Sequence, residues 1–200
     1  VEATVALFRP IDYHQHLEVA PGITACYVQA GHMLGSASIA LTIQEGGKTK
    51  TVVFSGDLGP SGLAILQDAE PLRKADLVFL ESTYGDRDHK PIKETLAEFG
   101  EIIKDAVARK ARLLVPAFAT GRSQQIIYHC EELFCAGTVK PFPIYLDSPM
   151  AIEASRVYLR YPDLFDDEAK AMERACELVR TQECVHPTPT AQDSMKLNDV

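Results

Sequence analysis

Two short turns carry the chemically distinctive side chains of this chain, and each turn follows an apolar run. His32 lies on a glycine-flanked turn after residues 23–28, and Asp57 lies on a second one after residues 51–54. A turn after a strand can aim a side chain outward with little backbone crowding. Histidine and aspartate are both good ligands for a divalent ion such as zinc. Each short pattern alone more often marks an ordinary turn, but the two together with a third block at residues 81–85 favour metal ligands at two loop tips.

Up to residue 88 the pattern is that of a hairpin-bearing sheet. Residues 38–44 alternate apolar and polar side chains, and a Gly-Gly turn joins them to residues 50–55, which predicts a β-hairpin. Further strands are predicted at residues 5–8, 23–28 and 75–80. The last of these is a continuous apolar run, typical of a buried central strand, and Glu81 follows it. Residues 61–73 show no clear period, and we expect a loop with a short helix there.

From residue 89 onward, helical patterns alternate with short apolar strands. Pro91 is expected to open a helix with one apolar stripe, since proline suits the first helical position. Other helices are predicted at residues 121–136, 150–161 and 167–181, strands at 112–116 and 143–146, and a loop at 181–193. Strands that alternate with helices favour a parallel α/β sheet. We therefore predict an α/β chain with one piece at residues 1–88 and another at residues 89–200.

Charge and cysteine content narrow the class of protein. The formal net charge of −8 speaks against a nucleic-acid clamp built by this segment alone, because such binders usually have a basic face. The charge does not exclude a nuclease, since metal ions can hold the scissile phosphate. The five cysteines lack Cys-x-x-Cys spacing, which favours free thiols in a reducing compartment over a cysteine zinc site. We expect a cytoplasmic protein with no membrane span and no signal peptide.

Five short blocks occur in one order along the chain. They are GHMLGSA from residue 31, SGDLG from residue 55, LVFLESTYGDRDH from residue 77, LLVPAFATGRSQQ from residue 113 and PIYLDSPMA from residue 143. Together they resemble the metallo-β-lactamase fold nucleases of the β-CASP family, which includes the zinc-dependent endonuclease of messenger-RNA 3′-end processing. The resemblance covers nearly the whole chain. It implies part of an αββα metallo-β-lactamase sandwich up to residue 88, followed by part of a Rossmann-like α/β β-CASP domain.

The resemblance implies roles for three side chains. His32 matches a zinc ligand of the family, and Asp57 matches the carboxylate that bridges two zinc ions there. Glu81 matches the family's motif A, a catalytic carboxylate that orients a downstream histidine. The implied reaction is hydrolysis of RNA phosphodiester bonds by a hydroxide that the two metals share. Without the resemblance, Glu81 would be a strand-end carboxylate that pairs with a nearby base such as Arg87.

Other polar side chains are weaker candidates. His89 lies in a family-like Tyr-Gly-Asp-Arg-x-His run and is a candidate for the substrate cleft, with a solvated loop histidine as an equal alternative. Arg122 lies just inside a helix start, where a guanidinium suits phosphate, but we favour a role in which it and Gln124 tie the helix to the sheet. His14 and His16 form a His-x-His pair that does not continue as x-Asp-His, so we exclude them as ligands.

The chain also departs from the family's pattern. The His-x-His-x-Asp-His block and the downstream histidine motifs are absent, so only His32 and Asp57 remain as ligands. Catalytic zinc keeps three protein ligands. We therefore expect an internal portion of a longer RNA-cleaving enzyme that holds two zinc ions, and a portion that is inactive alone. A hydrolase of another ester or amide and a non-catalytic RNA-processing scaffold stay open as alternatives, as does a homodimer.

Overall fold

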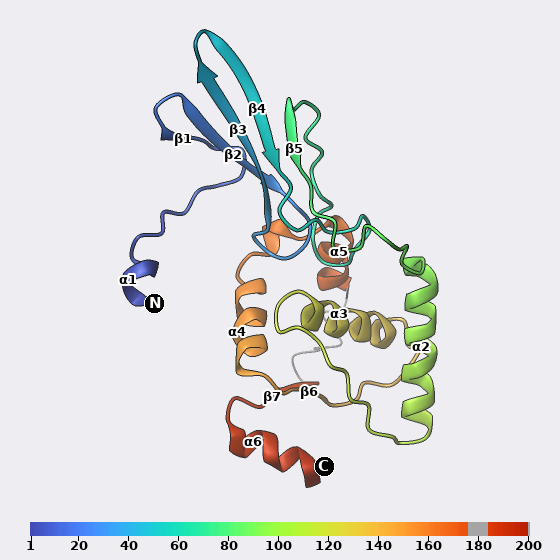
Figure 1. Cartoon of the computed structure of the whole chain (residues 1–200). Coiled ribbons are helices and arrows are strands. Elements are labelled where there is room, and N and C mark those ends of the chain that lie inside the picture. Colours follow the sequence, from blue (N-terminus) through green and yellow to red (C-terminus); the bar gives the residue numbers. More distant parts are fainter. Residues whose placement is uncertain (176–183, 200) are drawn as a thin grey trace. The chain divides into compact units, whose positions relative to one another are not determined.

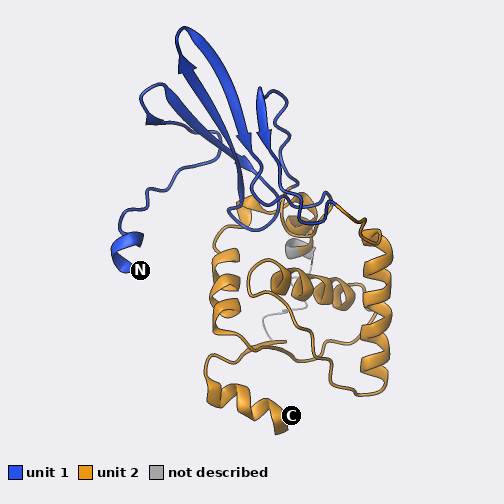
Figure 2. Ribbon diagram, in the orientation of Figure 1, with its two compact units in different colours: residues 1–61, 68–85 blue, residues 62–67, 86–200 orange. Residues whose placement is uncertain are grey.

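The computed structural model describes residues 1–175 and 184–199, which form two compact units (Figure 2). Unit 1 contains Val1–Ser61 and Asp68–Gly85, and unit 2 contains Gly62–Gln67 and Asp86–Val200. Strands dominate unit 1 and helices dominate unit 2 (Figure 1). This mixture confirms the predicted α/β class. The assignment of residues 1–88 and 89–200 to parts of two named domains stays a prediction.

Unit 1 is built on one five-stranded sheet in the order β1-β2-β3-β4-β5. The strands are β1 His16–Ala20, β2 Ile23–Gln29, β3 Ala37–Glu45, β4 Lys48–Phe54 and β5 Leu77–Phe79. The first four strands pair antiparallel in succession, and β5 joins β4 in parallel. The predicted strand at residues 23–28 and the predicted hairpin are confirmed.

The β3–β4 turn sets the register of this sheet. Gly46 and Gly47 both have positive φ, at 55° and 74°, and Glu45 pairs with Lys48 across them. A two-residue hairpin turn of this kind matches the right-handed twist of the strands and favours glycine at both positions. Because side chains alternate between faces, this register decides which residues point inward; Ala25, Val28 and Val53 are buried.

Three predictions for unit 1 are wrong. Residues 5–8 do not form a strand: the helix α1, Glu2–Val5, occupies their start. Residues 61–73 contain turns but no helix. Within residues 75–80 only Leu77–Phe79 is a strand, and it lies at the sheet edge with its three side chains 51–52% exposed. An apolar run predicts a strand, but its position depends on which strands pair with it.

Unit 2 packs helices around a small core and a two-stranded sheet. The helices are α2 Ile92–Ala108, α3 Arg122–Cys135, α4 Pro149–Tyr158, α5 Asp167–Ala175 and α6 Ala191–Lys196, with short 3₁₀ turns η1 Pro162–Leu164 and η3 Leu197–Asp199. The strands β6 Ile144–Leu146 and β7 Val185–Pro187 pair in parallel. Side chains of Ile103, Cys130, Phe134 and Val139 form the buried core. This core joins the apolar stripe of α2 to the inner face of α3.

Several details of unit 2 differ from the predictions. Residues 112–116 are not paired as a strand, and Leu114 is 90% exposed. Pro91 is the N-cap of α2 rather than its first helical residue. Part of the loop predicted at residues 181–193 is instead β7 and the start of α6. The remainder of the predicted helix 167–181 beyond Ala175 lies outside the described residues.

The sequence predicted free thiols, but not every cysteine in the structure is free. Cys26, Cys130 and Cys184 are free, but Cys135 is disulfide-bonded. Cys176 lies outside the described residues. The spacing of cysteines along a sequence does not reveal which of them the fold brings into bonding distance, because that depends on tertiary geometry. Among the described residues, no helix is both long and apolar enough to span a bilayer.

We predict that Ile103→Ala lowers the free energy of unfolding of unit 2 by about 2–5 kcal/mol, because it leaves a cavity in the α2–α3 core. Ile103 is 3% exposed, whereas its neighbour Ile102 is 47% exposed. Ile102→Ala is therefore the matched control and should change the free energy much less. Urea unfolding followed by far-ultraviolet circular dichroism measures both variants. Equal losses in the two variants would contradict this account of the core.

Candidate metal centre

In the unit 1 sheet, the strand register places three turns at the same end of the strands. Gln29 pairs with Ala37, so the turn that contains His32 connects the ends of β2 and β3 there. Phe54 pairs with Phe79 in the parallel β4–β5 ladder, so the residues after both strands leave the sheet at this same end (Figure 1). Asp57 and Glu81 follow these strands closely. The ladder thereby gathers all three sequence-predicted side chains from separate segments.

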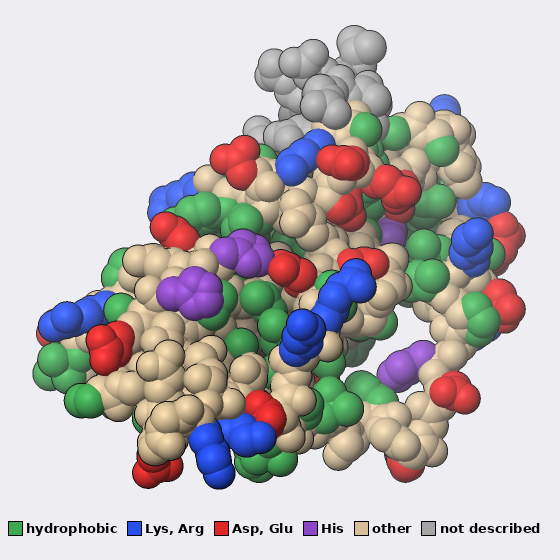
Figure 3. Space-filling view, turned by 90° about the horizontal axis from the view of Figure 1, so that it is seen from above, with side chains coloured by type: hydrophobic (Ala, Val, Ile, Leu, Met, Phe, Trp, Pro, Cys, Tyr) green, Lys and Arg blue, Asp and Glu red, His purple; other side chains and the backbone are tan. Residues whose placement is uncertain are grey.

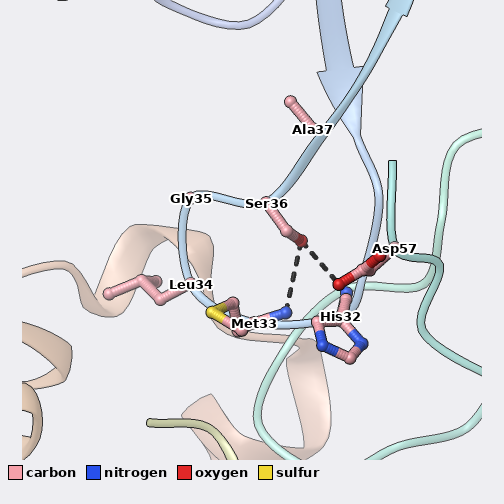
Figure 4. Close-up of a pocket in the computed structure, with 7 residues that line it drawn as sticks. All are labelled: His32, Met33, Leu34, Gly35, Ser36, Ala37 and Asp57. Atoms are coloured by element: carbon pink, nitrogen blue, oxygen red, sulfur yellow. Dashed lines mark hydrogen bonds between the residues drawn. The ribbon is translucent and has the colours of Figure 1, made fainter. Parts of the chain in front are cut away.

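His32 and Asp57 line the same surface hollow. The remaining lining residues are Met33, Leu34, Gly35, Ser36 and Ala37. Figure 4 shows the His32 imidazole and the Asp57 carboxylate on this shared hollow, each carried by its own loop. The structure thus brings together the two residues predicted as metal ligands, and their role as ligands stays a prediction.

Hydrogen bonds close the His32 turn on itself. The Ser36 hydroxyl accepts from the amide of His32 at 3.1 Å and from the amide of Met33 at 3.2 Å (Figure 4). At the base of the turn, the amide of Ala30 donates to the carbonyl of Ser36 at 3.2 Å. A side-chain oxygen that accepts local amides fixes a turn without regular secondary structure. The position of the imidazole is therefore restricted by its own loop.

The Asp57 turn is held by Glu81 from both sides. The Glu81 amide donates to the Ser55 hydroxyl at 2.9 Å, and the Glu81 carboxylate Oε1 accepts from the Leu58 amide at 2.7 Å. The Ser38 hydroxyl adds a bond to the Ser55 carbonyl at 2.7 Å. Hydrogen bonds thus bracket Asp57 at the residues two before it and one after it.

The Glu81 carboxylate is also fixed electrostatically. The Thr83 hydroxyl donates to Oε2 at 2.6 Å, and this bond, followed by that from the Leu58 amide, holds the pKa of Glu81 below its ordinary value. A smaller contribution comes from the charge of His32 when it is protonated. Within the described part of the chain no ion pair between Glu81 and Arg87 is found, and Arg87 pairs with Asp86 at 2.9 Å. Glu81 therefore holds the Asp57 turn through its carboxylate, which accepts from the Leu58 amide, and through its own amide, which donates to the Ser55 hydroxyl.

One backbone contact joins the two turns. The amide of Gly59 donates to the carbonyl of Ala30 at 2.9 Å. A Cβ atom on Gly59 would lie 1.9 Å from the carbonyl oxygen of Gly31 and 2.8 Å from the His32 amide nitrogen. Only glycine fits at this position, because any side chain would push the peptide that precedes His32. Gly59 belongs to the SGDLG block, but the sequence alone did not identify this role.

The other candidate residues are not among those that line this hollow. His14 pairs with Glu70 at 3.2 Å, and His16 is the exposed first residue of β1. His89 and Arg122 belong to unit 2, with Arg122 exposed at the first position of α3. A role for these two in the substrate cleft stays a prediction.

Gln124 is a buried link between two helices. Its Nε2 donates to the Ser155 hydroxyl at 2.9 Å and to the Ala119 carbonyl at 3.2 Å, and its Oε1 accepts from the Gly121 amide at 2.7 Å. Ser155 belongs to α4, so Gln124 ties the start of α3 to a helix rather than to the sheet that we predicted. Its neighbour Arg122 is exposed.

The donor set fits part of a metal site. An imidazole and a carboxylate are donor types that zinc and related divalent ions accept. Within the described residues, no group of three or more His, Cys, Asp or Glu side chains is placed to hold a metal. Catalytic zinc takes three protein ligands. His32 and Asp57 therefore suit two positions of a larger ligand set, and Glu81 suits the support of that set.

Comparison with known proteins adds independent findings. A family model described as "Beta-Casp domain" matches residues 123–200. "Ribonuclease TTHA0252" of Thermus thermophilus is 38% identical over 86% of this chain, which spans 38% of that protein. "Transcription termination factor FttA" of Methanosarcina mazei is 29% identical over 82% of this chain, which spans 26% of that protein. "Endoribonuclease YSH1" of Yarrowia lipolytica is 34% identical over 80% of this chain, which spans 19% of that protein.

We predict that Gly59→Ala destabilises unit 1 by roughly 1–3 kcal/mol, because the added methyl group overpacks the contact between the two turns. Gly100→Ala is the matched control. A Cβ there meets only the Leu133 side chain at an ordinary 3.6 Å, inside the helix α2. Alanine is favoured over glycine in a helix, so this control should stabilise the protein by ~0.5–1 kcal/mol. Urea denaturation measures both, and an unaffected Gly59→Ala variant would contradict the steric argument.

We predict that Glu81 contributes stability at neutral pH that is lost in acid. Its pKa is lowered in the folded protein, so the contribution is complete above the pKa of the unfolded chain, about 4.3, and disappears as pH falls through the folded value. Glu81→Gln removes the titrating group and should flatten this part of the stability profile between pH 3 and pH 6. Asp76, whose pKa is lowered chiefly by its bond to Lys50, keeps its own acid dependence in both proteins. Parallel profiles for the two proteins would show that Glu81 contributes nothing.

Proposed function

This chain belongs to the β-CASP family of the metallo-β-lactamase superfamily, and from that premise we propose that the complete protein is a metal-dependent nuclease that hydrolyses phosphodiester bonds in RNA. Two of its relatives are named as a ribonuclease and an endoribonuclease. The chain spans 38% and 19% of the lengths of these two relatives, so the activity of the whole protein is a proposal. The family implies metal ions, and we propose two zinc ions per complete chain.

The observation that carries this proposal is the hollow shared by His32 and Asp57. A side chain of each donor type reaches it from a different loop, and both loops are fixed by hydrogen bonds. A divalent ion held by such donors supplies Lewis-acid stabilisation of phosphate charge and lowers the pKa of bound water. We propose that His32 binds through a neutral ring nitrogen and Asp57 through its carboxylate, as two members of the ligand set.

We propose that Glu81 and Asp57 act together in the catalytic site. Glu81 fixes the Asp57 turn through the Leu58 amide, and the hydrogen bonds to its oxygens favour the ionised carboxylate. A fixed carboxylate positions its neighbour without reorganising during the reaction. This role is additional to the orientation of a downstream histidine, which the family resemblance implies.

Surface charge gives the substrate little general attraction. On the face shown in Figure 3, Lys and Arg side chains are interspersed with Asp and Glu rather than gathered into one field. The net charge of −8 agrees with that distribution. We therefore propose that RNA is held mainly at the metal site, with Arg122 and His89 as candidate substrate contacts. A cytoplasmic location and a homodimer stay predictions.

The direct test compares Asp57→Asn with the wild type in the complete protein. We expect kcat/KM for cleavage of a labelled RNA to fall on the order of 100-fold or more, because the metal supplies several kcal/mol of transition-state stabilisation. Zinc content, measured by atomic emission, should fall as well. Glu45→Gln is the control, since Glu45 is exposed at the hairpin end of β3, the end of that strand opposite the His32 turn. It should stay within about twofold of the wild type.

The alternatives predict different results. A wild-type protein that binds RNA but shows no metal-dependent turnover would contradict the nuclease and support a scaffold. Turnover of another ester or amide without RNA cleavage would support a different hydrolase. Unchanged RNA cleavage by Asp57→Asn would refute the assigned role of Asp57.

A further inference from the structure

Tyr13 reaches the base of the His32 turn from a segment that the sheet does not include. Its hydroxyl lies 2.8 Å from the carbonyl oxygen of Ser36 and 3.1 Å from Oε1 of Gln29. Ser36 and Gln29 stand on opposite sides of the base of this turn. We propose that Tyr13 is a positioning residue that holds the His32 turn in its metal-binding geometry. This inference rests on the proposed function, because it concerns the same metal site.

The base of the turn is buried and densely hydrogen-bonded. Ala30 is fully buried and Gln29 is 7% exposed. The Ala30 amide donates to the Ser36 carbonyl, and the Gly31 amide donates to Gln29 Oε1 at 3.3 Å. The Tyr13 hydroxyl therefore contacts two oxygens that already accept amides of the turn. It connects the two acceptors and restricts how far the sides of the turn can separate.

Tyr13 can act as a rigid support because its own segment is anchored to β2. The amide of the next residue, His14, donates to the carbonyl of Tyr27 at 2.9 Å. The His14 ring contacts the Glu70 carboxylate at 3.2 Å, and the Glu70 amide donates to the Gln29 carbonyl at 2.8 Å. The segment of Tyr13 is thus bonded to β2 directly, through His14, and also indirectly, through Glu70. The phenol is consequently held from behind while its hydroxyl faces the turn.

Removing the hydroxyl should loosen the turn without unfolding it. In Tyr13→Phe the Ser36 carbonyl keeps the Ala30 amide, and Gln29 Oε1 keeps the Gly31 amide. Neither buried acceptor is left without a donor, so the large penalty for an unsatisfied polar group does not arise. The variant loses only the hydroxyl that connects the Ser36 carbonyl to Gln29 Oε1. The two sides of the turn can then separate further, and His32, which lies within the turn, becomes less precisely positioned.

The test uses the complete protein with Co²⁺ as a spectroscopic probe. We expect Tyr13→Phe to raise the Co²⁺ dissociation constant roughly tenfold, as loss of a residue that supports a metal ligand typically does. The visible absorption bands of bound Co²⁺ should change, since they report ligand geometry. For RNA cleavage at saturating metal, kcat should fall while KM for RNA stays within about twofold.

Tyr27→Phe is the matched control. Tyr27 lies in β2 and is partly buried, and among the described residues its hydroxyl has no hydrogen bond. The same atom is thus removed from the same region without touching the turn. Tyr27→Phe should match the wild type in Co²⁺ affinity and spectrum.

The outcomes separate this inference from the function on which it rests. A wild-type protein that neither binds Co²⁺ nor cleaves RNA refutes the proposed function. A wild type that does both, with Tyr13→Phe equal to it in affinity and spectrum, refutes the role of Tyr13. If Tyr13→Phe does not fold, Gln29→Met removes the other half of the contact. A folded Gln29→Met that binds Co²⁺ like the wild type then overturns the proposal.

Discussion

The hydrogen bond from the Gly59 amide to the Ala30 carbonyl joins the two turns on which the candidate site depends. Its geometry leaves no space for a side chain, because a Cβ at residue 59 would lie within 2 Å of the Gly31 carbonyl oxygen, at 1.9 Å. The backbones of the His32 turn and the Asp57 turn are therefore in direct contact. Direct backbone contact fixes the distance between two side chains more firmly than packing of flexible side chains can, because peptides have few soft torsions.

Around this contact, polar groups rather than apolar packing organise the edge of the sheet. Ser36, Ser55 and Glu81 each accept amides from the turns beside them. Irregular segments need such partners because their amides and carbonyls have no ladder to join. The arrangement also leaves the two candidate ligands on the lining of one hollow, beside the side chains of Met33 and Leu34. A rigid sheet thus supports loops whose shape is decided locally.

Much of unit 1 could be predicted from the sequence because its signals are local. Alternation in residues 38–44 and the Gly-Gly turn specify a hairpin whatever else the chain does. Predictions failed where pairing or packing decides: residues 112–116 have a strand's composition but no strand partner in the described chain, and the run 75–80 became an edge strand. The free-thiol prediction failed at Cys135 for the same reason, since a disulfide depends on distance in space.

The sequence by itself determined the α/β class, the hairpin, and the identity of His32, Asp57 and Glu81 as the chemically distinctive residues. Residue type and spacing are enough for the fold class, the hairpin and the donor types of His32 and Asp57, which follow from backbone preference and donor chemistry. Glu81 was singled out only by the family that its block resembles. Only the tertiary structure decided that His32 and Asp57 share one hollow, that Glu81 holds the turn of Asp57, and that Gly59 and Tyr13 support the turn of His32. Those relations join segments distant in sequence, and the ladder register that brings them together exists only once the strands have paired.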